Sequence, residues 1–100
     1  MRILFKAPGE APHTMIIPHE LDVMQQLVGG YIETVPLGED IVIICNEEGK
    51  IKGLPANFYV EAIDDIIVGN AFFCKAGVED FTDISENDAK WICKRLGWPV

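Results

Sequence analysis

The spacing of apolar residues changes at a glycine pair, Gly29-Gly30. Ahead of the pair, apolar residues recur at intervals of three and four, as in an amphipathic helix with one buried stripe: Leu21, Met24, Leu27 and Val28. Behind it, residues 31–35 have the composition of a strand. We therefore predict a helix that begins near Pro18 or His19, ends at Gly29 in the left-handed conformation, and leads directly into a strand.

The clearest strand prediction is residues 41–45, where five apolar and mostly β-branched residues follow one another. This composition is typical of a strand that is buried on both faces, and therefore of a central position in a sheet. Shorter apolar runs predict further strands at residues 2–6 and 13–17.

A hairpin is predicted after this central strand. Asn46 favours the start of a turn, and Gly49 suits a position that needs a positive φ, so residues 46–50 are expected to form the loop. Residues 50–54 would then return as a short partner strand.

The next segment, residues 58–63, is ambiguous and could hold one helical turn. Residues 66–74 are predicted to be one long strand with a bulge at Gly69-Asn70. A tight hairpin at that dipeptide is the alternative, although its two arms would be very short.

A second helix is predicted near the C-terminus. Ser85 caps it, and Asp88 three residues later completes a variant of the capping box. Its buried stripe again has helical spacing: Ala89, Ile92, Cys93 and Leu96. Gly97 ends the helix, and Trp98 is placed to fold back on Cys93.

These elements predict one α+β domain over residues 1–100. Its mixed, mostly antiparallel sheet of about five strands would pack against two helices. The chain has 100 residues, 49% of them hydrophobic and 24% charged, which is ordinary for a globular domain with its own core.

The charge of the chain excludes some partners. Acidic residues outnumber basic ones 16 to 8, for a net charge of -8, so direct binding to nucleic acid or to anionic lipid is disfavoured. A run of apolar residues as short as 41–45 cannot span a membrane, and a cytoplasmic location is expected. Three cysteines without a Cys-x-x-Cys pair indicate reduced thiols rather than a disulfide framework.

Acidic residues gather between positions 79 and 88. Glu86 and Asp88 belong to the first turn of the predicted helix, where they meet the positive end of its dipole. Glu79, Asp80 and Asp83 precede the helix and have no such structural reason. They could form a solvated loop or a docking face for a basic protein partner, with imitation of nucleic acid as a special case.

Several short motifs follow one another along most of residues 1–84. They are Met1-Arg2-Ile3-Leu4-Phe5-Lys6-Ala7-Pro8-Gly9, Leu27-Val28-Gly29-Gly30-Tyr31-Ile32-Glu33, Asn46-Glu47-Glu48-Gly49-Lys50, Gly53-Leu54-Pro55 with Asn57, and Asp65-Ile66-Ile67-Val68-Gly69. In this order the chain resembles a family catalogued as domain of unknown function 3846, which occurs in bacteria, phages and other mobile elements. The resemblance implies a bacterial or phage setting, and it brings no activity, substrate or catalytic residue.

Catalysis finds little support in the sequence. A cysteine nucleophile would need Cys45, Cys74 or Cys93 exposed beside His13 or His19, whereas each cysteine falls where burial is expected. We therefore predict no catalytic residue.

Metal and cofactor sites are likewise not predicted. The histidines and neighbouring acids lack the spacing of a zinc site, and the aspartates lack the spacing of a calcium loop. We predict no metal ligand and no cofactor.

The preferred hypothesis is a non-enzymatic protein-interaction module with a protein partner that could be basic. Its candidate partner-binding residues are Glu79, Asp80, Asp83, Asn57 and Tyr31. Tyr59, Trp91 and Trp98 would form a further binding patch if they were exposed together. The alternatives are a small enzyme that uses a cysteine or a carboxylate, and a structural homo-oligomer, which the mean hydropathy of +0.18 favours.

Overall fold

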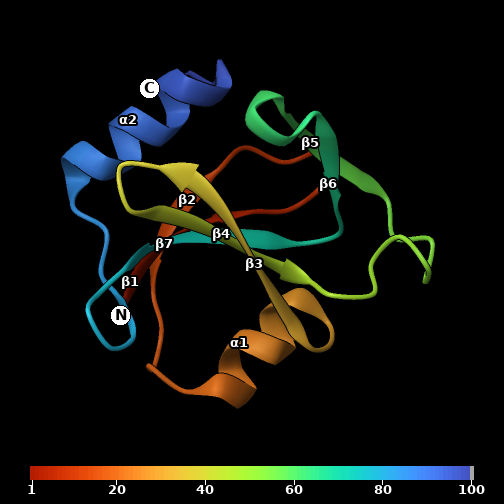
Figure 1. Cartoon of the computed structure of the whole chain (residues 1–100), viewed down its shortest axis with the longest axis horizontal. Coiled ribbons are helices and arrows are strands. Elements are labelled where there is room, and N and C mark those ends of the chain that lie inside the picture. The colour runs from red at the N-terminus through yellow and green to blue at the C-terminus, as the bar shows by residue number, and fades with distance from the viewer. Residues whose placement is uncertain (100) are drawn as a thin grey trace.

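The computed structural model describes residues 1–99, and its largest element is a six-stranded sheet (Figure 1). The strands of this sheet are β1 (Arg2–Lys6), β2 (His13–Ile16), β3 (Ile32–Gly38), β4 (Ile41–Asn46), β7 (Ala71–Ala76) and β8 (Phe81–Thr82). Their order is β2-β1-β7-β4-β3, with β8 paired to β7. The pairings within it are antiparallel, which confirms the predicted α+β class.

A second, two-stranded sheet stands apart from the first. It consists of β5 (Ala56–Val60) and β6 (Asp65–Val68), which are antiparallel and are joined by the 3₁₀ turn η1 (Glu61–Ile63). We call β5, η1 and β6 the arm. The helical turn considered for residues 58–63 is real, but it occupies only the last three of them.

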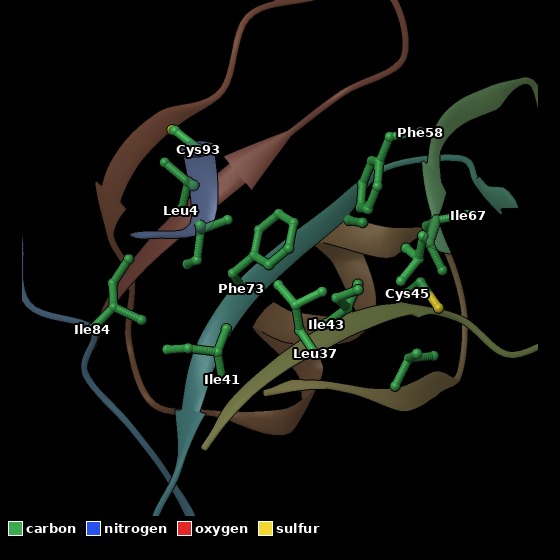
Figure 2. Packing of buried hydrophobic residues seen from close by; sticks show 14 residues of the cluster. Leu4, Leu37, Ile41, Ile43, Cys45, Phe58, Ile67, Phe73, Ile84 and Cys93 are labelled. Carbon is green, nitrogen blue, oxygen red and sulfur yellow. The ribbon is translucent and has the colours of Figure 1, made fainter. Parts of the chain in front are cut away.

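Helices and the arm cover the two faces of the main sheet. The helix α1 (Leu21–Val28) packs on one face through Met24 and Val28. The helix α2 (Glu86–Leu96) and the arm share the opposite face, where Cys93 and Phe58 join the same buried cluster (Figure 2). The sheet is therefore the middle layer of the fold, as Figure 1 shows.

The strand β4 is buried on both faces, as its composition predicts. Ile41, Ile43 and Cys45 contribute to the cluster beneath α2 and the arm, which Figure 2 draws. Val42 and Ile44 contribute to the cluster beneath α1. Because side chains alternate along a strand, an unbroken apolar run was needed to supply both cores.

The two glycines that follow α1 are required for different reasons. Gly29 caps the helix with φ +80°, as predicted. Gly30 is needed for space, because a Cβ there would lie 2.8 Å from Nδ2 of Asn46. Asn46 is 5% exposed, and its side chain donates to the Val28 carbonyl at 3.2 Å and accepts from the Glu48 N–H at 2.8 Å. One buried amide thus joins the end of α1 to the end of β4.

The capping predicted for α2 is confirmed. Ser85 and Asp88 exchange both bonds of a capping box, and the Trp98 N–H donates to the Cys93 carbonyl at 2.7 Å. The Trp98 ring meets those of Phe58 and Phe73 edge-on, with centroids 5.2 Å and 5.8 Å away. Trp98 is therefore partly buried against the core, so the exposed patch considered for it is not formed.

Two predicted boundaries are wrong because local hydrogen bonds compete with regular structure. The helix begins at Leu21 rather than near Pro18, since the Glu20 N–H turns back to the Pro18 carbonyl at 2.9 Å. Residues 50–54 form turns rather than a strand, because the N–H groups of Lys52 and Leu54 bond inside the loop.

The single long strand predicted for residues 66–74 is also wrong. β6 pairs with β5, whereas β7 pairs with β1 and β4 in the other sheet. Gly69, with φ +74°, makes the corner between them. Neither a bulge nor a hairpin describes this junction, because the two strands belong to different sheets.

Within residues 1–99, no helix combines the length and the apolar character that crossing a membrane requires.

We expect Asn46→Ala to destabilise the fold by about 1–3 kcal/mol, because it removes a buried amide and leaves the Val28 carbonyl and the Glu48 N–H without their partner. Asn70→Ala is the matched control, since the exposed Asn70 amide donates to the neighbouring Leu27 carbonyl at 3.2 Å. Its loss should be within about 0.5 kcal/mol. Urea unfolding of both variants measures the difference, and equal losses would contradict the role of Asn46.

Candidate functional site

A groove of about 220 Å³ lies between the arm and the main sheet. It is lined by residues of β3, β4, the following loop and the arm: Glu33, Val35, Cys45, Asn46, Glu47, Gly49, Lys50, Ile51, Ile63, Asp65, Ile66, Ile67 and Val68. These residues are far apart in the sequence, so only the placement of the arm brings them together.

Exposed isoleucines surround this groove. Ile51 is 86% exposed, Ile66 43% and Ile63 42%, and all three line the groove. We call them the isoleucine patch. Aliphatic side chains of this size are usually buried, and a contiguous exposed group of them marks a contact surface.

The charges of the groove are unequal. Lys50 forms an ion pair with Asp65, in which its Nζ donates a hydrogen bond to the carboxylate. This hydrogen bond is the main reason why the pKa of Asp65 lies below its usual value. Glu33 and Glu47 are exposed and have no ion-pair partner among residues 1–99. The groove therefore presents two uncompensated carboxylates next to apolar side chains.

Close packing sets the floor of the groove. A Cβ on Gly49 would lie 2.8 Å from a methyl group of Val68, so the loop after β4 can approach the arm only with a glycine at this position. The positive φ predicted for Gly49 occurs instead at Gly53, with φ +67°.

The side chain of Asn57 fixes the arm to the main sheet. Its Nδ2 donates to the carbonyls of Lys6 and Gly69, each at 2.8 Å. Its Oδ1 accepts from Nζ of Lys6 at 3.0 Å. Asn57 is one of the predicted partner-binding residues, and its contact with a partner stays a prediction.

Lys6 is a structural residue that the sequence did not reveal. It is 7% exposed, and its Nζ also donates to the Ala7 carbonyl at 2.9 Å and lies 5.7 Å from the centroid of the Trp98 ring. Burial lowers the pKa of this amine. A lysine in an apolar strand carries no signal that distinguishes such a buried position from a snorkelling one.

The predicted acidic residues lie elsewhere: Glu79 and Asp80 lie in the turn between β7 and β8, and Asp83 lies between β8 and α2. The Asp80 carboxylate accepts from the Phe81 N–H at 2.7 Å, and the Asp83 carboxylate accepts from the Arg2 N–H at 3.0 Å. The expectation that these acids have no structural reason is therefore wrong for Asp80 and Asp83. Glu79 is exposed.

Tyr31 lies at the junction of α1 and β3 and is 67% exposed. The five predicted partner-binding residues thus occupy three separate parts of the fold, and none of them lines the groove. No signal in the sequence located the groove, because Ile51 and Ile66 fall within the predicted strands at residues 50–54 and 66–74, where isoleucine is an expected residue.

The three cysteines are free and buried, as predicted. Burial, reinforced by the Glu33 carboxylate 3.8 Å away, raises the pKa of the Cys45 thiol to about 11. Burial raises the pKa of Cys74 to about 12 and also raises that of Cys93. A protonated thiol is a poor nucleophile, so these groups do not resemble an activated cysteine.

Residues 1–99 contain no group of three His, Cys, Asp or Glu side chains placed to hold a metal ion.

The family model for a domain of unknown function, DUF3846, matches residues 1–97. The chain belongs to this family. Searches of curated proteins and of solved structures found no match. The DUF3846 match spans both sheets and both helices, so the groove and the arm lie inside the family domain.

We expect the raised thiol pKa values to make this DUF3846 domain less stable at alkaline pH. Below the unfolded pKa of 9.0 the thiols are protonated in both states, and their contribution to the stability of the fold is fully present. As the pH rises from there toward the folded pKa values of about 11 and 12, the thiols ionise first in the unfolded chain, and this contribution is lost. Between about pH 8 and pH 10, wild type should lose about 1 kcal/mol per thiol more than the Cys45→Ala, Cys74→Ala variant. Urea unfolding at both pH values tests this, and parallel losses would contradict it.

We expect Asp83→Ala to reduce stability by about 0.5–1.5 kcal/mol, because the Arg2 N–H loses its acceptor. Asp83→Asn keeps an acceptor oxygen and should lie close to wild type. Glu79→Gln serves as the control for loss of charge alone. If Asp83→Ala and Glu79→Gln have the same urea midpoint, the Asp83 bond contributes nothing measurable.

Proposed function

We propose that this DUF3846 domain is a non-enzymatic protein-interaction module that binds a basic protein partner. The observation that carries the proposal is the isoleucine patch, with Ile51, Ile63 and Ile66 exposed around one groove. Exposed apolar side chains supply the affinity of a contact, whereas the polar rim supplies its specificity.

Charge supports a basic partner. The net charge of -8 attracts cations over long distances, and Glu33 and Glu47 carry negative charge into the groove. We propose that Glu79, Asp80 and Asp83 assist this attraction from the segment between β7 and α2, and that Asn57 and Tyr31 add polar contacts. In the special case of nucleic-acid mimicry, the partner would be a protein that normally binds phosphates.

The setting that fits this role is the cytoplasm of a bacterium, including one that carries a phage or another mobile element. An enzyme that uses a cysteine is the weaker alternative, because burial raises the pKa of all three thiols. A homo-oligomer built on the groove is also weaker, because Glu33 and Glu47 of two copies would face each other.

We expect Ile51→Asp to abolish partner binding, because it places a charge in the isoleucine patch. Val78→Asp is the matched control, since Val78 is fully exposed at the tip of the β7–β8 turn and lies outside the groove. Both variants should keep their stability within about 0.5 kcal/mol.

The measurement is capture from a bacterial lysate by each immobilised protein, with the captured proteins identified and compared by quantitative mass spectrometry. Wild type and Val78→Asp should retain the same basic protein, and Ile51→Asp should lose it. If Ile51→Asp retains every protein that wild type captures, the groove is not the docking site.

A further inference from the structure

We propose that the groove binds an extended segment of the partner, which adds to β6 as a third strand of the arm and alternates aliphatic with lysine or arginine side chains. This inference rests on the function proposed above and specifies the mode of binding and the chemistry of the occupant. It depends on the backbone of the arm, on the apolar wall of the groove and on its carboxylates.

The strand β6 has a free edge. Within residues 1–99 it pairs with β5 alone, so one side of its backbone has no strand partner. Four consecutive residues of β6 line the groove: Asp65, Ile66, Ile67 and Val68. Because side chains alternate between the two faces of a strand, a groove that touches all four runs along the backbone edge. An edge of this kind is a template for pairing with another strand.

The Asp65 side chain already bonds to one backbone group of this edge. The Ile66 N–H donates to the Asp65 carboxylate at 2.8 Å, which supplies the kind of acceptor that a neighbouring strand would offer. In an antiparallel strand the N–H and C=O of one residue point the same way and the pattern repeats every second residue. The Ile66 carbonyl and the Val68 N–H therefore share the side on which this bond is made.

The other edge beside the groove is less suitable. The strand β3 forms the outer edge of the main sheet, but Pro36 lies within it and its register shifts between Pro36 and Gly38. A proline and a bulge both oppose further pairing. Strand addition is therefore directed to β6.

The side chains around the edge define the occupant. Ile51, Ile63 and Ile66 offer aliphatic contacts, and Glu33 and Glu47 offer negative charge that no cation of the described chain neutralises. A strand that places aliphatic residues on one face and cations on the other can satisfy both sets at once. The volume of about 220 Å³ suits individual side chains of a peptide rather than a whole compact ligand.

A second copy of this chain is a poorer occupant. Each copy brings the same carboxylates to the contact, and like charges that face each other disfavour it. A cationic segment of a different protein removes this repulsion and replaces it with attraction.

The test uses a fluorescent synthetic peptide of alternating valine and lysine, with binding to the full chain followed by fluorescence anisotropy. Wild type should bind this peptide and should not bind its counterpart of alternating valine and glutamate. Two methylated forms of the valine–lysine peptide are compared, one methylated at every valine nitrogen and the other at every lysine nitrogen. Because alternate N–H groups of a strand point to opposite sides, one of the two forms loses the N–H groups that a new strand donates to β6, and that form should not bind. In hydrogen exchange, bound peptide should protect the Val68 amide.

The charge requirement is tested with two double variants of equal net charge. Glu33→Gln with Glu47→Gln should weaken binding of the valine–lysine peptide about fivefold. Glu20→Gln with Glu48→Gln alters exposed glutamates outside the groove and should leave the affinity close to wild type.

Four outcomes would overturn the inference. They are undiminished binding of both methylated peptides, equal weakening in both double variants, an unprotected Val68 amide in the complex, and no binding of the valine–lysine peptide. If Ile51→Asp still loses a basic protein from a lysate while any of these occurs, the interaction function stands and strand addition is wrong. If Ile51→Asp captures what wild type captures, the proposed function itself fails.

Discussion

The Asn57 side chain determines where the arm lies, and the groove depends on it. Its amide donates to the Lys6 carbonyl at the end of β1 and to the Gly69 carbonyl at the corner between the two sheets. Its oxygen accepts from the buried Lys6 amine. A two-stranded sheet is marginal in isolation, so this amide and the apolar cluster beneath the arm must hold it together. Moving the arm would separate β6 from Glu33 and remove one wall of the groove.

The corner at Gly69 is the second constraint. Its φ of +74° is accessible to glycine at little cost, and a Cβ there would lie 2.7 Å from a methyl group of Leu54. Conformation and space thus both require glycine. The corner lets β7 enter the middle of the main sheet while β6 leaves it for the arm. The same sequence that reads as one continuous strand therefore supplies two sheets.

Local signals in the sequence predicted the central strand of the main sheet, the C-terminal end of α1 and the capping of α2. The apolar run of β4, the glycine after α1 and the Ser85 capping box each act over a few residues, so their composition is enough to identify them. The arm could not be predicted in this way, because Asn57 bonds to a residue 51 positions earlier in the chain. Nothing in the composition of residues 56–60 indicates such a partner.

The groove was missed for a related physical reason. Its members come from β3, β4, a loop and the arm, and only the path of the chain at Gly69 brings them together. The acidic run, by contrast, was visible in the sequence, but the Asp80 carboxylate accepts from the Phe81 N–H of β8 and the Asp83 carboxylate accepts from the Arg2 N–H of β1. Acidic residues are easily counted in a sequence, whereas the N–H groups that donate to their carboxylates are known only from the fold.

An exposed isoleucine patch would normally invite self-association. Here two carboxylates lie beside it, on a chain that carries a net charge of -8. Between two copies these charges repel, and for a cationic partner they attract, while the apolar contact area is the same in both cases. Specificity can therefore arise without a deep pocket, because the charges that keep the apolar surface from pairing with itself also select the partner that can cover it.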